Sequence, residues 1–399
     1  MPSIHQVFTF HHFDREIVQL YSSHTIRRFT VALICIFEPI YLFIYFNHSF
    51  SKTLLFYAAI SLIYGLFVPF GAKIMAKLGL KKAMLWSVPF LFLYYLVLWQ
   101  INLFFLLFFL AIILRVIYAL FYWPAYHTDV ARFSKRKTRG EQMSVATVVY
   151  SIVSVVAPFL GGLIIFKFGF PVLFIIVLIL LFVSAVPLLF SKEIHEVYTD
   201  SYERAFKQIL SKKARRDSIA FGAFGFDAGV SMFIWPIFMF VLVINYELMG
   251  IITSGALFLS LLFALYIGEL ADVKRKKLLR IGSVITAIAW FLKTFVTTPF
   301  NAFLAHAAYR FAAVSSGIPF RAIMYDKASE DGKVLDRYIV FREMAHNLGR
   351  AIMFIALAII FFFVPVTKIY FIFPLAGVFA LLFMLLAKGE DKEEIYEKK

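Results

Sequence analysis

The segment that decides the fold reads GELADVKRKKL at residues 268–278, and a second version of it, AKIMAKLGLKK, lies at residues 72–82. Other charged residues recur in the same order at a similar spacing. They form the pairs Arg28 and Arg216, Glu38 and Asp227, Arg115 and Arg310, and Asp129 and Asp326. The spacing drifts only from 188 residues (28 to 216) to 197 residues (129 to 326). Such slow drift in a constant order indicates two copies of one ancestral half.

The composition excludes a soluble protein and predicts an all-α integral membrane protein. Hydrophobic residues make up 62% of the 399 residues, and the mean hydropathy is +0.84. Soluble proteins are only roughly 45–50% apolar. A spanning helix needs about 20 apolar residues, so the chain has room for about twelve. The single cysteine, Cys35, excludes an internal disulfide and a multi-cysteine metal site.

Apolar stretches predict twelve transmembrane helices in two pseudo-symmetric six-helix bundles. The expected spans are 29–46, 53–75, 83–99, 103–128, 142–166, 171–190, 217–242, 248–271, 278–297, 302–325, 340–363 and 369–387. Lysine and arginine gather in every second gap, while the other gaps hold only Lys52, Lys167 and Lys368. Because positive residues mark the cytoplasmic side, we expect a multi-pass protein of the plasma (inner) membrane with both termini in the cytoplasm. Membrane lipid, rather than nucleic acid, is the partner that this charge distribution indicates.

The same pattern divides the chain into five parts. The expected boundaries are a cytoplasmic N-terminal segment at 1–28, a bundle at 29–190, a cytoplasmic linker at 191–216, a second bundle at 217–387 and a cytoplasmic tail at 388–399. Apolar residues recur at helical spacing in the linker, which predicts an amphipathic helix at the membrane surface. A disordered linker is the alternative.

Charged residues inside spans point to function, because a charge in the bilayer costs about 2.5–3.5 kcal/mol on insertion scales. Glu38 and its repeat mate Asp227 are the candidate proton carriers, with Arg115 as the cation that tunes them. Opposite charges at similar depth predict ion pairs, and movement of the arginine would then release the acid to take up a proton. A permanent pair that only makes insertion tolerable is the alternative. Lys293 stands near the outer end of its span, where we expect its side chain to reach the surface.

Arginine and aromatic side chains within spans are the candidates for a substrate cavity. The candidate substrate-binding residues are Arg115, Tyr118, Tyr122, Trp123, Trp235 and Arg310. Trp123 and Trp235 each precede a proline, which removes a helical hydrogen bond and allows a bend. The two arginines would act as charge-assisted donors to an anionic substrate. Packing against lipid is the alternative for each aromatic residue.

No residue pattern indicates a cofactor, a metal ion or an enzyme. Of the nine histidines, His5, His11 and His12 lack acidic partners at ligand spacing, His127 and His346 lie near cytoplasmic ends, and His306 is alone near an outer end. The phosphate-cradling pattern GxxxxGK[ST] is absent from the sequence, and so are GxSxG and HExxH. A membrane-embedded acyltransferase is the enzymatic alternative. It predicts a cluster of histidines or acids near one membrane face and no internal repeat.

Together with the repeat, the segment at 268–277 resembles the loop motif G-x-L-A-D-R-x-G-R-K/R of the major facilitator superfamily. It keeps Gly268 and Asp272, whereas the first copy has Ala76 in place of the aspartate. The resemblance covers roughly residues 25–390 and implies two bundles of six helices. It also implies that Asp272 caps a neighbouring helix and latches the two halves together.

Two further stretches resemble motifs of the same superfamily. Arg115 resembles the arginine of the fourth span, which is implicated in proton coupling, although Ala119 replaces the usual glycine. The stretch APFLGG at 157–162 resembles the fifth-span motif G-P-x-x-G-G, which is associated with antiporters that export drugs. Small residues in this stretch also let helices approach closely.

The sequence therefore predicts a secondary active transporter that moves a small organic solute by alternating access. We expect a monomer coupled to protons, and the aromatic content and the APFLGG stretch favour efflux by antiport. Uptake of an organic anion or a sugar by symport is the main alternative. A scramblase or sensor on the same fold and the acyltransferase are the others. The candidate gating residues are Asp272, Gly268, Asp129, Asp326, Glu343 and Arg350.

Overall fold

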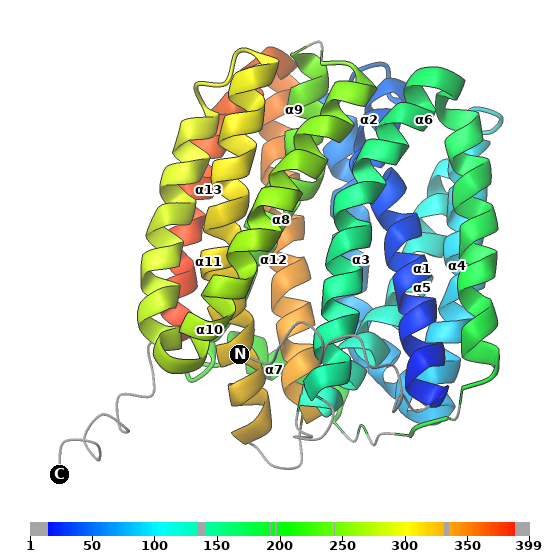
Figure 1. The fold of residues 1–399 in the computed structure, drawn as a ribbon, viewed down its shortest axis with the longest axis vertical. Coiled ribbons are helices and arrows are strands. Elements are labelled where there is room, and N and C mark those ends of the chain that lie inside the picture. The colour runs from blue at the N-terminus through cyan, green and yellow to red at the C-terminus, as the bar shows by residue number, and fades with distance from the viewer. Residues whose placement is uncertain are drawn as a thin grey trace.

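The protein is a bundle of long helices that lie side by side (Figure 1). The computed structural model describes residues 15–134, 140–191, 193–195, 198, 200–242, 244–330 and 335–387. Within these residues every regular element is a helix, which confirms the expected all-α fold of two bundles. The start of α1 lies at the same end of the bundle as α7, and α2 and α9 lie at the opposite end (Figure 1).

The N-terminal half runs through six helices. They are α1 (Arg15–Ile34), α2 (Glu38–Tyr45), α3 (Phe50–Leu78), α4 (Leu80–Trp99), α5 (Leu106–Ser134) and α6 (Gly140–Leu189). A short helix, α7 (Tyr202–Leu210), connects the halves. The C-terminal half contains α8 (Arg215–Gly229), the π-helical turn η4 (Val230–Ile234), α9 (Trp235–Val241), α10 (Tyr246–Lys293), α11 (Pro299–Glu330), α12 (Leu335–Phe363), η5 (Val366–Phe371), α13 (Ile372–Leu381) and η6 (Leu382–Ala387).

Two of the helices contain a break that divides each into two lengths. Helix α6 breaks at Gly169, whose φ of 78° lies in the region that glycine adopts without steric cost. Helix α10 breaks at Lys274. By length and composition, eight helices in the described residues qualify as membrane spans, or nine when α1 and α2 count as one bent span. Neither α11 nor the part of α10 beyond Lys274 is among them, so composition supports the twelve spans only in part.

The helix that enters the expected first span begins early. Helix α1 begins at Arg15, within the expected N-terminal segment, and where the membrane span starts along it stays a prediction. The helix breaks at residues 35–37, and α2 begins at Glu38 with Pro39 in its first turn. Proline is well suited to that position, because its missing N–H has no partner there in any helix. The break places the carboxylate of Glu38 at a helix start.

Helix α7 occupies the middle of the expected linker. Ser201 caps it by accepting a hydrogen bond from the backbone N–H of Arg204 at 3.3 Å. Ala205 is buried, and Phe206 and Ile209 pack against the core, whereas Leu210 is 82% exposed. The helix therefore has one buried and one exposed side, and its location at a membrane surface stays a prediction.

The two halves meet along two seams that differ in length. Helices α3 and α12 contact each other along the first half of α3. The Ser51 hydroxyl donates to the carbonyl of Ala358 at 2.7 Å at one end of this contact, and the Tyr64 hydroxyl donates to Glu343 at 3.0 Å at the other. In the described residues, helices α6 and α10 approach closely near the end that holds α2 and α9, where Gly162 lies against Tyr246 and Gly250 against Pro158. The last hydrogen bond there joins the N–H of Phe159 to the hydroxyl of Ser254 at 2.9 Å. The halves are thus closed at that end.

We expect Gly250→Ala to destabilise the seam between α6 and α10. A Cβ atom at Gly250 would lie 2.5 Å from the carbonyl oxygen of Pro158, so the two backbones would have to separate. Overpacking of this kind costs about 1–3 kcal/mol. The thermal unfolding midpoint of the purified protein should fall by several degrees. Gly222→Ala is the control, because its Cβ would meet its nearest neighbours at an ordinary 3.6 Å; equal midpoints for the two variants would contradict the prediction.

Candidate functional site

A cavity of about 450 Å³ lies between the two halves, on the side where α6 and α10 diverge. The N-terminal half lines it with Arg28 of α1 and with Ser151, Ser154 and Val155 of α6. The C-terminal half lines it with Phe224, Asp227, Ala228, Ser231, Met232, Leu257, Ser260, Leu261, Ala264, Tyr309, Arg310, Ala313, Val314, Ser316, Gly317 and Arg321. Arg310 and Arg321 lie on α11 about 16 Å apart along the helix axis. The cavity therefore extends along the bundle from its middle toward the end that holds α7.

This cavity has more positively than negatively charged side chains, and they differ in whether their polar atoms have hydrogen-bond partners. Three guanidinium groups, those of Arg28, Arg310 and Arg321, line it together with one carboxylate, that of Asp227. The Arg28 Nε atom donates to the hydroxyl of Ser154 at 2.8 Å. The Nε atom of Arg310 is buried and has no hydrogen-bond partner within the described residues. The cavity is thus positively charged, with donor capacity left over at Arg310.

Asp227 is held by two aromatic side chains rather than by a cation. The indole N–H of Trp290 donates to one carboxylate oxygen at 2.6 Å, and the hydroxyl of Tyr309 donates to the other at 2.9 Å. Asp227 forms no ion pair in the described part of the chain, so the expected pair with Arg310 is wrong. Trp290 and Tyr309, rather than Arg310, supply the donors to its two oxygens.

Glu38 repeats this arrangement in the N-terminal half. One of its oxygens accepts hydrogen bonds from the hydroxyls of Tyr57 at 3.3 Å and Tyr94 at 2.9 Å. Tyr94 and Trp290 stand 196 residues apart (94 to 290), within the range of the other repeat pairs. Each half therefore holds a buried acid on its first span through an aromatic donor on its third. Glu38 does not line the cavity.

Arg115 does not pair with Glu38, which corrects the second expected ion pair. Its guanidinium lies over the rings of Tyr94 and Tyr118, 5.2 and 5.1 Å from the ring centres, and its Nη1 atom is buried without a hydrogen-bond partner in the described residues. Tyr94 separates the two charges, because its hydroxyl binds Glu38 while its ring faces Arg115. Glu38 and Arg115 therefore both contact the same residue, Tyr94.

The aromatic candidates of α5 pack inside the N-terminal half and are not part of the cavity lining. Tyr118 and Tyr122 are stacked at 5.6 Å, and Tyr122 is stacked on Tyr126 at 5.5 Å. The guanidinium of Arg27 lies 3.9 Å from the ring centre of Tyr122. Trp123 is stacked on His127, next to the seam with α12. Arg27 was not among the sequence candidates, although its neighbour Arg28 belongs to the repeat.

Trp235 and Lys293 lie together in the interior of the C-terminal half. Trp235 is 1% exposed and stacks on His306 with ring centres 5.5 Å apart. Lys293 is fully buried, so the expected extension of its side chain to the surface is wrong. Its ammonium group lies over the rings of Trp235, Trp290 and Tyr309. These aromatic faces provide an attraction that a lipid environment lacks.

A polar network centred on Glu343 joins the halves at the seam of α3 and α12. The buried Glu343 carboxylate pairs with Arg342, lies 3.3 Å from the Nε2 atom of His127 on α5, and accepts a hydrogen bond from Tyr64 on α3 at 3.0 Å. Arg342 also lies 3.2 Å from the His127 ring nitrogen. The network therefore connects α12 of one half with two helices of the other.

Arg350 extends this network along α12. Its Nε atom donates to the hydroxyl of Ser61 on α3 at 3.1 Å, and its Nη2 atom donates to Asn347. Asn347 in turn donates to the Glu343 backbone carbonyl at 2.9 Å. Glu343 and Arg350, which the sequence singled out as gating candidates, thus lie in one connected set of polar contacts between the halves.

We expect Glu343→Gln to lower the thermal unfolding midpoint strongly. Removing one partner of a buried ion pair leaves the other charge uncompensated, at a cost of about 3–5 kcal/mol. The matched control is Glu203→Gln on α7, where both partners of the Glu203–Lys207 pair are 74% exposed. Such a surface helix pair contributes only about 0.3–0.5 kcal/mol. A midpoint for Glu343→Gln as high as that of the control would show that the network does not hold the halves together.

The other gating candidates lie on α5, α10 and α11. Asp326 pairs with Arg275, which joins α10 to α11 within the C-terminal half. Asp129 is 3% exposed near the end of α5. Gly268 lies within α10, and so does Asp272, whose side chain lies outside the described part of the structure. The latch expected of Asp272 therefore stays a prediction.

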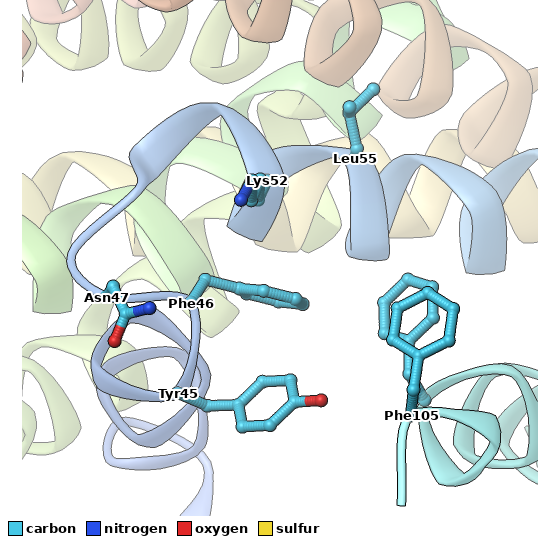
Figure 2. A pocket seen from close by; sticks show the side chains of 7 residues that line it. Tyr45, Phe46, Asn47, Lys52, Leu55 and Phe105 are labelled. Atoms are coloured by element: carbon cyan, nitrogen blue, oxygen red, sulfur yellow. The ribbon is translucent and has the colours of Figure 1, made fainter.

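A second pocket, of about 360 Å³, lies within the N-terminal half near the turn between α2 and α3 (Figure 2). Tyr45, Phe46, Asn47, Lys52 and Phe105 surround it in Figure 2, and all come from this half. Because it lacks residues of the C-terminal half and holds no carboxylate, we do not assign it to the main site. In the described residues no group of three or more histidine, cysteine or acidic side chains is placed to hold a metal ion.

Two helical halves with a polar cavity between them are the architecture of a membrane transporter. The family model of the Major Facilitator Superfamily matches residues 20–245, which is more than half of the chain. The protein therefore belongs to the major facilitator superfamily. A search of curated proteins found no match.

Solved transporter structures share the fold over almost the whole chain. The nucleoside transporter NupG is 15% identical with a TM-score of 0.68, and the alignment covers 94% of this chain and 99% of that one. The human organic anion transporter MFSD10 is 13% identical with a TM-score of 0.65, covering 93% and 99%. A D-xylose–proton symporter is 16% identical with a TM-score of 0.67, covering 92% and 96%. At these identities the likeness concerns the fold.

Proposed function

We propose that this protein is a secondary active transporter that carries a small organic anion through the cavity between its halves by alternating access. The observation that carries the proposal is the charge of that cavity, where Arg28, Arg310 and Arg321 face one carboxylate that is already hydrogen-bonded. A guanidinium group binds carboxylate or phosphate oxygens through parallel hydrogen bonds. The unpartnered Nε atom of Arg310 supplies such a donor near the middle of the bundle.

The surroundings of the arginines suit an organic anion rather than an inorganic one. Met232, Leu257, Leu261 and Val314 contribute apolar surface to the same cavity. A volume of about 450 Å³ lies within the range of about 300–1,000 Å³ that is usual for sites of small organic molecules. An anionic group at Arg310 and an apolar body against α10 would fill it. The similarity to an organic anion transporter agrees with this proposal.

Proton coupling is the second part of the proposal, with Glu38 and Asp227 as the proton carriers. Both acids are buried, and both are bound by neutral aromatic donors instead of cations. A carboxylate without a permanent counter-ion in a low-dielectric interior is free to exchange a proton as its surroundings change. Arg115 acts on Glu38 through Tyr94 and tunes this exchange.

We assign the change that opens the cavity alternately to each side of the membrane to the two seams between the halves. In this structure the halves are closed where α6 meets α10, near the end that holds α2 and α9, and the cavity extends toward the other end. The reverse state would require α6 and α10 to separate there and the cavity to close near Arg28 and Arg321. We propose that the Glu343 network on α12 is rebuilt in that step. We further propose that the protein works as a monomer in the plasma (inner) membrane with both termini in the cytoplasm.

Transport into liposomes that contain the purified protein tests the proposal. Three solutes of different charge serve as probes: fluorescein as the organic anion, rhodamine 123 as the organic cation and uridine as the neutral solute. The account predicts accumulation of fluorescein driven by an imposed pH gradient, and the direction of the productive gradient separates symport from antiport. Accumulation of rhodamine 123 or uridine alone would reject the anionic substrate. Movement of lipid without accumulation of any probe would indicate a scramblase.

A further inference from the structure

The C-terminal half contains a buried basic pair that the cavity does not include. Lys293, near the end of α10, and His306, on α11, are 0% and 1% exposed. The Lys293 ammonium nitrogen lies 3.4 Å from the Nδ1 atom of His306. Neither side chain forms an ion pair in the described part of the chain.

We propose that Lys293 and His306 form a buried proton-binding site in which the two side chains share one proton. This deepens the proposed function, because the site would be a second station for the coupling proton beside Asp227. The Nδ1 atom of His306 accepts a hydrogen bond from the ammonium form of Lys293, or donates one to its amine form. The proton moves between Nζ and Nδ1 without any other bond being broken.

The surroundings of the pair are built to hold a cation without fixing it to a carboxylate. The Lys293 nitrogen lies 3.8, 4.4 and 4.2 Å from the ring centres of Trp235, Trp290 and Tyr309. Aromatic faces attract an ammonium group by about 2 kcal/mol or more when it is desolvated. Unlike a carboxylate, they also accept the neutral amine. The cage therefore suits both protonation states of Lys293.

The same rings connect the pair to Asp227. Trp290 and Tyr309 present their faces to Lys293 while their N–H and O–H groups bind the two oxygens of Asp227. The other charged group nearby is Arg310, which follows Tyr309 on α11 and lines the cavity. Helix α9 contributes Trp235 to the cage, and Phe373 of α13 packs against Trp235 and Trp290. A change at Asp227 thus reaches Lys293 through two side chains.

His306 has one further polar atom that is open to a proton path. Its Nε2 atom is buried and has no hydrogen-bond partner in the described residues, and the same holds for the indole nitrogen of the stacked Trp235. Buried polar groups in folded proteins are nearly always satisfied, often by an ordered water. These two atoms mark the side of the pair from which a water molecule would deliver the proton.

Tryptophan fluorescence of the purified protein tests the site without any substrate. Two of the five tryptophans, Trp235 and Trp290, belong to the cage and report on it. Trp123 stacks on a different histidine, His127, so the substitution Trp123→Phe removes its contribution to the emission. In that background we expect one reversible step in emission between about pH 5 and pH 10, the range spanned by ordinary histidine and lysine titration. His306→Gln and Lys293→Met should each abolish it.

Lys293→Arg is the decisive variant, because arginine keeps the cation in the cage but does not release its proton. We expect it to retain the thermal midpoint within a few degrees while it loses the emission step. Lys52→Met and His48→Gln, both at exposed positions, are the matched controls and should leave the step unchanged. A step that persists in Lys293→Arg or His306→Gln, or its absence from the parent protein, would overturn the proposal.

The transport assay then separates this site from the transporter function. In liposomes we expect Lys293→Arg to lose at least about tenfold in gradient-driven accumulation of fluorescein while exchange of fluorescein across the membrane stays within about twofold. Equal accumulation by the variant and the parent would reject the role in coupling. Absence of fluorescein transport in the parent, with the emission step intact, would reject the proposed function and leave the proton site standing.

Discussion

Arg310→Gln should reduce the affinity of the cavity for fluorescein by roughly 10- to 150-fold. Hydrogen bonds to charged groups contribute about 1.5–3 kcal/mol, and each 1.4 kcal/mol corresponds to a factor of about ten. Arg310 lines the cavity, and its buried Nε atom has no hydrogen-bond partner in the described residues, so glutamine would remove both the charge and the donor fork. The measurement is the concentration of fluorescein that gives half-maximal exchange in liposomes.

Arg280→Gln is the matched control for Arg310→Gln. Arg280 lies on α10 in the same half, but it is exposed and does not line the cavity. Its affinity should stay within about twofold of the parent. Equal affinities of the Arg310 and Arg280 variants for fluorescein would remove Arg310 from the substrate site, whatever the absolute transport rate.

Replacing the two buried acids should abolish gradient-driven accumulation and spare exchange. Glu38→Gln and Asp227→Asn keep the size of each side chain and an oxygen that accepts from Tyr94 or Trp290, but neither variant carries a proton. We expect accumulation of fluorescein under a pH gradient to fall by at least about 100-fold in the double variant. Exchange, which needs no net proton movement, should remain within about fivefold.

The two single variants distinguish a shared role from a divided one. If one acid carries the coupling proton alone, its variant should match the double variant and the other should resemble the parent. Asp217→Asn serves as a control, because Asp217 binds Lys327 and Tyr338 in the C-terminal half without lining the cavity. Full accumulation in the double variant would mean that neither acid is a carrier.

The repeat explains why much of the site was predictable from the sequence. Glu38 and Asp227 were identified as mates because a charge inside a span is rare, and the structure places them in matching hydrogen-bond arrangements. The ion pairs expected of them were wrong, because tyrosine and tryptophan side chains rather than the arginines donate to the two carboxylates. Tyr94 and Trp290 stand at the repeat spacing. The sequence therefore contained a signal that these aromatic residues, rather than the arginines, bind the two acids.

Other parts of the site depend on packing that has no local pattern. The cage of Lys293 draws on α9, α10 and α11, and its residues stand at no shared spacing. The position of Lys293 near the end of its span predicts a side chain that reaches the surface. Only the tertiary structure shows the rings that enclose it. In the sequence, Arg28 and Arg321 stand near the ends of the expected spans 29–46 and 302–325, where basic residues are common on the cytoplasmic side. They became cavity residues because α6 and α10 diverge and expose the inner faces of α1 and α11.

The central claim is that the cavity between the halves binds the transported anion. The variant Ala313→Cys tests it, because Ala313 lines the cavity near Arg310 on α11. The variant is made in a Cys35→Ala background, which removes the single native cysteine. The rate of reaction with a charged, water-soluble maleimide is measured with the protein in lipid nanodiscs, with and without fluorescein. The account predicts that fluorescein slows the reaction at least about tenfold and that rhodamine 123 does not. A rate that fluorescein leaves unchanged at concentrations that saturate transport would contradict it.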